Sequence, residues 1–512
     1  MFQTILRNAT IIDGTGADSY HGDLAIQDGK IAAIGNLATA TAVETIDVEQ
    51  RCVTPGFIDI HRHGEVAVFT QEPRHFDALH LAQGLTTLIH GNCGLSAVPL
   101  SGDETQFQTF CNYLTPITGA IPTQWLGLDV AGYLQRLNVA STVVNHGILV
   151  GGGTLRTLVA GFGDAPLTSG QLTAYHRHLE QALSDGAVGV SLGLGYAPEC
   201  FYTLAQLCQA LAPLQNSGRL LTIHLRQEGA GVVSAVEEAI ALARHLHTPL
   251  QISHLKAIGN RDNTMETMLQ RIAHARADGV DVMCDVYPYT AGSTQLLHLL
   301  PPEVKAGGIP RVLEMLQDPH ACNALRQRMA TATDYENIIA LVGFENVVVT
   351  GYDAAEGKTL TQIAKESDCD GYDALFKTLL DTQCTATMID FIVREEDMAL
   401  ALQQPYTTVI SDATYPTKGK CHPRVYGAYP RLIETYVREK KILTLPQAIH
   451  KITALPASRC GLTTKRRLAV GMDADICVFH PENIHETATF AQPNQLAQGM
   501  DWVFVGGQKV KD

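Results

Sequence analysis

Two histidines spaced two residues apart, His61 and His63, follow a short apolar run that ends at Ile60. In an extended strand, residues i and i+2 lie on the same face, so both imidazoles can point toward one site where the strand ends. Neutral imidazoles are good ligands for transition-metal ions. The motif therefore indicates a metal site, with a hydrogen-bonded surface pair as the simpler alternative.

Other residues with metal-binding or catalytic chemistry also follow strand-like runs. Cys93 lies between Gly91 and Gly94, which allow a sharp turn of the backbone. Zinc accepts imidazole nitrogen, thiolate and carboxylate ligands, and a catalytic zinc site keeps one position for water. A single such residue is more often structural, but several at strand ends favour one shared site: Tyr196, His224, Arg226, Glu228, His254, Lys256, Asp285, Tyr287 and Asp412.

The elements that must position these side chains alternate between strand-like and helical patterns, which predicts parallel strands with crossover helices. We expect eight strands, at residues 56–60, 86–90, 141–149, 188–192, 220–225, 249–254, 280–286 and 407–411. Eight parallel strands fit an α/β fold of the TIM-type (β/α)8 barrel, in which reactive residues lie at the carboxyl ends of strands. A doubly wound open sheet is the alternative, but no G-x-G-x-x-G follows the first strand.

The chain divides into two predicted domains. Short β-like runs at both chain ends predict a small β-sandwich domain built from residues 1–54 and 462–512. Residues 55–461 form the predicted hydrolase barrel. An inserted, largely helical segment at about 295–405 precedes the last barrel strand, with helices expected at 310–316, 373–380 and 395–402.

Composition excludes several classes of protein. A formal charge of −15 and the absence of a basic run argue against nucleic-acid binding. No apolar run approaches the length of about 18 residues that a membrane helix needs, and the N-terminus does not resemble a signal peptide. We therefore expect a cytoplasmic protein with a small-molecule substrate and no disulfides among its 12 cysteines. The sequence leaves an oligomer open.

The chain resembles the amidohydrolase superfamily, and within it the N-acyl-D-amino-acid deacylases (D-aminoacylases). Characteristic stretches include Pro55 to His63, Gly-Asn-Cys-Gly at 91–94 and Asp285 to Thr294. The others follow in family order at residues 151–156, 193–198, 222–226, 252–256, 411–412 and 422–424. With the terminal β segments, the resemblance covers nearly the whole chain.

The resemblance implies a zinc site with one tight position, held by Cys93, His224 and His254. His61, His63 and Asp412 would border that zinc and a weaker second position. Many amidohydrolases bridge two metals with a carboxylated lysine from the fourth strand. Residues 189–192 hold no lysine, so Cys93 would take that role.

The resemblance also implies roles in hydrolysis of the amide bond of N-acyl-D-amino acids. Asp412 would transfer protons as general base and acid, and the Tyr196 hydroxyl would polarise the scissile carbonyl. Lys256, Tyr287 and Arg424 would bind the substrate's α-carboxylate. Ser293, within the strand-seven motif, and Arg62, between the two histidines, are further candidate substrate-binding residues.

Departures from the family pattern lie near the predicted site. Arg62 and Gly152 stand where a small residue and a histidine are common, Gly64-Glu65 replaces an acidic pair, and Ala413 begins a loop that usually starts with glycine. The leucines between Gln295 and Leu300 suggest an apolar wall and offer no arginine for an acidic side chain. An apolar D-amino acid is therefore the expected substrate.

Three other functions compete with this prediction. A cyclic-amide hydrolase of the dihydroorotase or hydantoinase type shares the barrel but normally uses the missing lysine. A hydrolase of D-amino-acid-containing dipeptides, or of unrelated amides, is harder to exclude from the sequence. A non-catalytic amidohydrolase-like scaffold is the remote alternative, because such proteins tend to lose ligands and every candidate ligand is present here.

Overall fold

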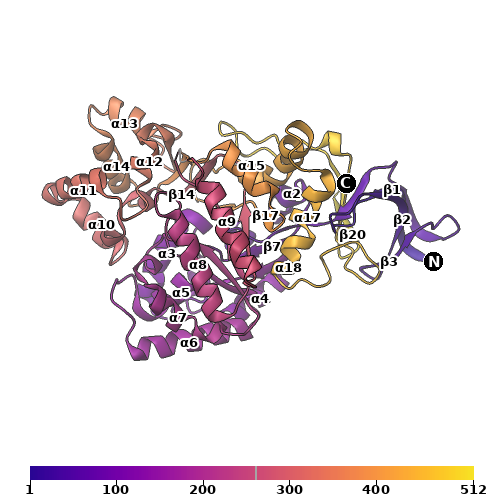
Figure 1. Ribbon diagram of the computed structural model, residues 1–512, viewed down its shortest axis with the longest axis horizontal. Helices are drawn as coiled ribbons and strands as arrows, with labels where there is room; N and C mark the ends of the chain where they lie inside the picture. The colour runs from indigo at the N-terminus through magenta and orange to yellow at the C-terminus, as the bar shows by residue number, and fades with distance from the viewer. Residues whose placement is uncertain (260–261, 512) are drawn as a thin grey trace.

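Strands from both ends of the chain form one eight-stranded sheet at one end of the molecule, opposite the inserted helices (Figure 1). The computed structural model describes residues 1–259 and 262–511. The path through this sheet is β20-β19-β18-β5-β1-β2-β3, with β4 pairing parallel to β1. The strands are β1 (Phe2–Ile11), β2 (Tyr20–Gln27), β3 (Lys30–Gly35), β4 (Ala42–Asp47), β5 (Cys52–Pro55), β18 (Ile476–Phe479), β19 (Met500–Val505) and β20 (Gln508–Lys511).

The centre of the molecule consists of parallel strands in two sheets. One sheet has the order β6-β7-β8 and the other the order β17-β13-β12-β11-β10-β9. The strands are β6 (Phe57–Asp59), β7 (Leu85–His90), β8 (Asn145–Ile148), β9 (Val150–Gly151), β10 (Gly189–Gly193), β11 (Leu220–His224), β12 (Leu250–Ile252), β13 (Val282–Val286) and β17 (Thr407–Val409). Each of the eight predicted strand segments overlaps one of these strands.

The two parallel sheets approach each other at both edges. On one side, β8 leads into β9 with a single residue, Leu149, between them, and the Leu149 N–H donates to the His90 carbonyl (2.8 Å). On the other side, the loops after β6 and β17 bond through Asp412 N to His61 O and His63 N to Ala413 O, both at 2.9 Å. These bonds hold the loops that carry His61 and Asp412 side by side.

Helices that follow the parallel strands cover their outer face, and their sequences contain clear start signals. Helix α6 (Ser169–Ser184) begins after Thr168, whose hydroxyl accepts from the Gln171 N–H while the Gln171 side chain bonds back, forming a capping box. Its buried residues Tyr175, Leu179 and Ala182 recur every three or four positions, so one face packs inward.

The other helices of this central part are α1 (Ala67–Thr70), α2 (Pro73–Leu81), α3 (Glu104–Thr118), α4 (Val130–Asn138), α5 (Gly152–Ala160), α7 (Leu204–Ala210), α8 (Val232–Leu246), α9 (Thr264–Ala277), α16 (Arg424–Arg431), the π-helix η7 (Leu432–Glu439), α17 (Leu445–Ile452) and α18 (Ala454–Arg459). Among the described residues, no helix is both long and apolar enough to cross a bilayer.

The segment before β17 contains more β structure than predicted. Helices α10 (Ile309–Leu316), α14 (Gly371–Asp381) and α15 (Glu395–Gln403) match the three expected helices, and α11 (Pro319–Thr331), α12 (Ile338–Val342) and α13 (Leu360–Glu366) accompany them. A three-stranded antiparallel sheet, ordered β14-β16-β15, was not predicted. Its strands are β14 (Ala291–Gln295), β15 (Val347–Thr350) and β16 (Thr387–Phe391). Strand β14 is made of small and polar residues, which give no apolar alternation.

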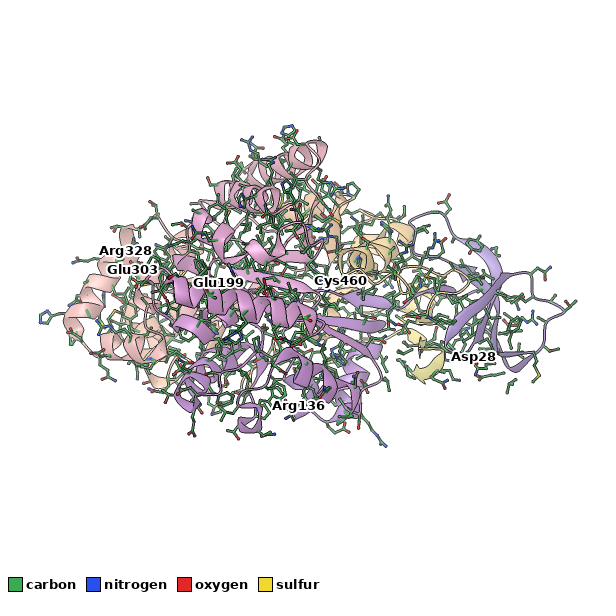
Figure 2. All side chains as sticks on the ribbon, turned by 90° about the horizontal axis from the view of Figure 1, so that it is seen from below. Asp28, Arg136, Glu199, Glu303, Arg328 and Cys460 are labelled. Carbon is green, nitrogen blue, oxygen red and sulfur yellow. The ribbon has the colours of Figure 1, made fainter. Side chains whose placement is uncertain are left out.

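Ion pairs connect the surface of this segment. Figure 2 shows Glu303 and Arg328 close together at its end of the molecule, and Arg328 Nε lies 2.8 Å from Glu303 Oε1. Arg328 also contacts Asp334 at 2.7 Å. Glu303 and Asp334 are largely exposed and Arg328 is one-third exposed, so these pairs contribute little to stability.

Phe57 connects the central strands to the terminal sheet. Its buried ring packs against Tyr429 of α16 and Phe479 of β18, with ring centroids 6.2 Å apart in each pair. Glycine at position 84 allows this close packing, because a Cβ there would lie 2.7 Å from the Phe57 ring. The aromatic cluster therefore joins three segments that are distant in sequence.

We expect Phe57→Ala to destabilise the fold by about 3–5 kcal/mol, because it removes a buried ring and leaves a cavity. Urea unfolding followed by circular dichroism measures the effect. Phe391→Ala is the matched control, since Phe391 is 39% exposed. Equal unfolding midpoints for the two variants would contradict the assigned role of Phe57.

Candidate active site

The predicted metal ligands lie at the carboxyl ends of parallel strands. His61 and His63 follow β6, and Cys93 follows β7. His224 ends β11, His254 lies two residues beyond β12, and Asp412 lies three residues beyond β17. All six side chains are at most one-tenth exposed. The strands thus bring these residues, separated by up to 351 positions, to one edge of the sheets.

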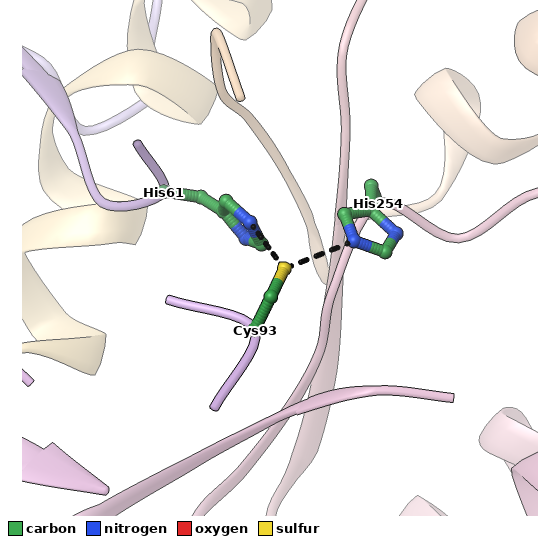
Figure 3. A group of neighbouring side chains, drawn as sticks. All are labelled: His61, Cys93 and His254. Atoms are coloured by element: carbon green, nitrogen blue, oxygen red, sulfur yellow. Dashed lines mark hydrogen bonds between the residues drawn. The ribbon is translucent and has the colours of Figure 1, made fainter. Parts of the chain in front are cut away.

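Cys93 lies between two imidazoles at the centre of this cluster. Its Sγ atom lies 3.3 Å from His61 Nε2 and 3.5 Å from His254 Nε2. Dashed lines in Figure 3 mark both contacts. The three ligand atoms form one group of metal-binding geometry, with all atoms within 4.8 Å of one another. A thiolate with two imidazoles is a ligand set typical of zinc.

Two further groups of ligand atoms overlap this one among the described residues. In the first, His61 Nε2 and His63 Nε2 each lie 3.4 Å from Asp412 Oδ1. In the second, His224 Nδ1 lies 2.9 Å from His254 Nε2, and Glu228 is the third member. The predicted trio of Cys93, His224 and His254 is therefore divided between two groups that share His254.

The backbone at three of these residues is left-handed, which is unfavourable for residues with a side chain. Cys93 has φ 54°, His254 has φ 32° and Asp412 has φ 49°. Each such residue lowers the stability of the fold by of order 1–3 kcal/mol, so surrounding interactions must hold it in place. Bonds from His254 N to Asp285 Oδ1 (2.6 Å) and from Asp412 N to the His61 carbonyl (2.9 Å) hold two of them.

Buried carboxylates orient the ligand histidines. Glu228 Oε1 and Lys256 Nζ both lie 2.9 Å from His254 Nδ1. A hydrogen bond to the Glu228 carboxylate requires a proton on Nδ1 and leaves Nε2 available for a metal. The same carboxylate accepts from Lys256 Nζ through both oxygens, at 2.8 and 2.7 Å. Asp285 additionally accepts from Gln251 Nε2 (2.9 Å). Sequence analysis placed Glu228 and Asp285 at strand ends but gave them no role.

Charged and polar neighbours in the cluster favour the ionised forms of Cys93 and Asp412. Burial alone would raise the pKa of the Cys93 thiol, but His61 and His254 outweigh burial and hold it well below the usual range. Burial opposes ionisation of Asp412 as well, yet Arg424 and His61 lower the pKa of that carboxyl. Arg424 contacts Asp412 directly, with NH1 to Oδ2 at 2.9 Å.

The residues present fit a bound metal ion. Thiolate, imidazole and carboxylate atoms converge, and within each of the three groups the ligand atoms lie within 4.8 Å of one another. A buried cation would balance the negative charge of Cys93 and Asp412.

Two adjoining cavities open from the cluster and share Tyr196, His254, Ser293, Thr294 and Asp412. The first also contains the predicted carboxylate-binding residues Lys256, Tyr287 and Arg424. The second is lined by His63, Cys93, Leu95, Ile117 and Thr414. The Tyr196 hydroxyl bonds to Thr294 Oγ1 (3.0 Å), and the Ser293 carbonyl accepts from Arg424 NH2 (3.1 Å).

Arg62 does not line either cavity. Its fully buried guanidinium points to the opposite side, where it contacts Asp59 Oδ2 (3.3 Å), His80 Nε2 (2.6 Å) and the Tyr415 hydroxyl. Side chains of adjacent residues in an extended segment point in opposite directions, so the residue between two ligands faces away from them. We therefore assign Arg62 no substrate-binding role, contrary to the prediction.

Glu199 explains the glycine at position 152. Its buried carboxyl, in the body of the molecule in Figure 2, accepts from the Gly193 N–H (2.7 Å). A Cβ on Gly152 would lie 2.4 Å from Glu199 Oε1, and one on Gly94 would lie 1.8 Å from Oε2. Glu199 therefore fills the space that a histidine at position 152 would need, beside the loop that carries Cys93.

The expected apolar wall between Gln295 and Leu300 is not part of the cavity. Leu296, Leu297, Leu299 and Leu300 are at most 1% exposed and belong to the hydrophobic core. His298 is the residue of this stretch that lines the cavity. Glu336 and Asp390 also line it, and sequence analysis missed both because they come from the inserted segment.

Comparisons with known proteins agree with this site. No protein-family model matches the chain. It is 32% identical over 512 residues to an N-acyl-D-aspartate deacylase of Alcaligenes xylosoxydans xylosoxydans, covering 99% of this chain and 92% of that protein. A D-aminoacylase of the same organism is 30% identical over 525 residues, covering 99% and 94%.

The chain also resembles a solved structure of a deacylase. The N-acyl-D-glutamate deacylase from Bordetella bronchiseptica, complexed with zinc and a phosphonate that mimics the tetrahedral intermediate, superposes with a TM-score of 0.82 at 30% identity. The alignment covers 99% of this chain and 96% of that one. The chain belongs to the N-acyl-D-amino-acid deacylase (D-aminoacylase) family of amidohydrolases.

Proposed function

We propose that the protein is a zinc-dependent hydrolase of N-acyl-D-amino acids that releases a carboxylate and a D-amino acid. The observation that carries this proposal is the position of Cys93 between His61 and His254, beside a cavity with two cationic side chains. The similar proteins named as deacylases of N-acyl-D-amino acids, one of them complexed with zinc, support it.

The metal would be held by residues of the three overlapping groups. Cys93, His224 and His254 are the proposed tight ligands, and His61, His63 and Asp412 would border a weaker second position. When bound, zinc supplies Lewis acidity that makes water a competent nucleophile near pH 7. No lysine occurs in β10 to bridge two metals, which disfavours the cyclic-amide hydrolases.

Asp412 is the proposed general base and acid. Its carboxylate is fixed by Arg424 and lies beside His61 and His63, at the boundary that both cavities share. There it would take a proton from the attacking water and return it to the departing nitrogen. Tyr196, on the same boundary, would donate a hydrogen bond to the carbonyl oxygen as negative charge develops.

The two cavities, of about 40 and 20 Å³, would widen to receive the two halves of the substrate. Lys256, Tyr287 and Arg424 would bind the α-carboxylate in the first cavity, where the guanidinium lies 4.5 Å from the Tyr287 ring centroid. Leu95 and Ile117 give the second cavity an apolar wall suited to a short acyl group. Fixing the α-carboxylate and the scissile carbonyl leaves only one direction for the side chain, which would select the D-configuration.

The parallel strands would form a closed TIM-type barrel. We infer this from the strand order of the two sheets and the bonds between the loops after β6 and β17. Closure would place all candidate ligands on one rim of the barrel. The terminal strands, residues 1–54 and 462–512, would form the small β-sandwich domain beside it.

Removing His254 should remove the metal, whereas removing His63 should not. His254 belongs to two ligand groups and His63 to one. We expect His254→Ala to lose nearly all of the roughly one tightly bound zinc per chain, and His63→Ala to retain it. Elemental analysis of dialysed protein measures the content. Equal retention by both variants would contradict the assigned ligand roles.

Asp412→Asn should reduce turnover of N-acetyl-D-amino acids by at least about 100-fold, because asparagine cannot exchange the proton. Asparagine tolerates the left-handed backbone at this position better than most residues. Zinc content and the unfolding midpoint of the variant serve as controls for an intact site. Activity near that of the wild type would defeat the role of Asp412.

A further inference from the structure

The end of the cavity that holds the α-carboxylate residues also contains carboxyl groups that the proposed reaction does not use. Besides Glu228 and Asp412, the first cavity is lined by Asp390 and Glu336. Among the described residues, the second cavity has no acidic group other than Asp412. The additional acids therefore lie beside the amino-acid half of the substrate and not beside its acyl half.

Asp390 is buried without a complete set of partners. It lies on β16, is 2% exposed, and its Oδ1 has no hydrogen-bond partner within residues 1–259 and 262–511. A Cβ on Gly292 would lie 2.7 Å from this oxygen and 3.4 Å from the Tyr287 hydroxyl, so Asp390 and Tyr287 face the same space. An unpaired buried acceptor is costly and indicates a missing donor.

Glu336 and His298 form a second polar pair in the same cavity. His298 Nε2 lies 3.1 Å from Glu336 Oε1, and Glu336 Oε2 accepts from the Glu228 N–H. His298 Nδ1 has no partner in the described chain. Around the pair, Ile258, Ile338 and Ile392 supply apolar contact. A side chain with an aliphatic stem and a polar end would match this combination.

Each cation of the cavity already has a carboxylate partner. Lys256 bonds to both oxygens of Glu228, and Arg424 contacts Asp412. An acidic substrate side chain would thus meet Asp390 and Glu336, whereas Lys256 and Arg424 already pair with carboxylates and are the residues proposed to bind the α-carboxylate. Burial raises the pKa of Asp390 to about 7, so a cationic ligand would replace the proton that the empty carboxyl tends to hold.

We propose that Asp390, with the His298–Glu336 pair beside it, forms a subsite for a cationic side chain of the D-amino acid. The preferred substrates would be N-acyl derivatives of D-arginine or D-lysine, and acidic side chains would be excluded. This inference rests on the proposed function and deepens it. It also replaces the apolar side chain expected from sequence.

The test compares wild-type enzyme and Asp390→Asn with N-acetyl-D-arginine and its neutral isostere N-acetyl-D-citrulline. N-acetyl-D-leucine, N-acetyl-D-glutamate and glycyl-D-leucine complete the panel, the last placing a cation at the acyl end. We expect wild-type kcat/KM to be roughly 10- to 100-fold higher for the arginine than for the citrulline compound. Asp390→Asn should remove this preference and change the leucine rate less than about 3-fold.

Asp353→Asn, an exposed aspartate of the same inserted segment, is the matched control and should keep the preference. Calorimetry of D-arginine and D-citrulline binding to the wild type and to Asp390→Asn measures the affinity of the subsite independently of turnover. Hydrolysis of N-acetyl-D-leucine without discrimination between arginine and citrulline would overturn the subsite alone. Preference for glutamate or for glycyl-D-leucine, or an equal loss with every substrate in Asp390→Asn, would also overturn it. Tighter binding of D-arginine without hydrolysis of any N-acetyl compound would overturn the proposed function and keep the subsite.

Discussion

The site depends on left-handed backbone at Cys93, His254 and Asp412, because this conformation turns the chain sharply at the end of three different strands. Each of the three turns presents a side chain to the common centre. The cost is of order 1–3 kcal/mol per residue, and the surrounding hydrogen bonds must offset it. The Asp285 carboxylate and the bonds between the loops after β6 and β17 are such bonds. The strained positions coincide with the proposed ligands and the proposed proton-transfer residue, as is common at catalytic sites.

Burying so many polar groups in the ligand cluster costs free energy. A thiol, four imidazoles and a carboxylate lie almost out of contact with solvent, and several of their atoms lack partners within the described residues. A bound cation and the surrounding carboxylates would offset the cost of burying these groups. Glu228 illustrates the economy of the arrangement, since it orients His254 and holds Lys256 in place. The metal position and the substrate position are coupled through this one side chain.

Sequence predicted the strand ends well and the inserted segment poorly, for physical reasons. Apolar runs bounded by glycine and polar residues have strong local signals, so His61, Cys93, His224, His254 and Asp412 were placed at strand ends correctly. Arg62 was wrongly predicted to bind substrate because side chains alternate along an extended segment, so the residue between His61 and His63 faces away from the site. His298 and Asp390 line the same cavity although they are far apart in sequence, and the β14-β16 pairing brings their segments together. No local pattern predicts this arrangement, and the leucines next to His298 were mistaken for a cavity wall.

Similarity to the relatives does not decide which side chain the substrate carries. An N-acyl-D-aspartate deacylase and a D-aminoacylase are nearly equally identical to the chain. The strand-end residues would carry out the proposed reaction, and the inserted segment supplies the residues that would distinguish substrates. The most direct test of the central claim is hydrolysis of paired N-acetyl-D- and N-acetyl-L-amino acids, with zinc quantified in the same preparation. Zinc-dependent turnover of the D-compounds is the predicted result, and hydrolysis confined to the L-compounds would contradict it.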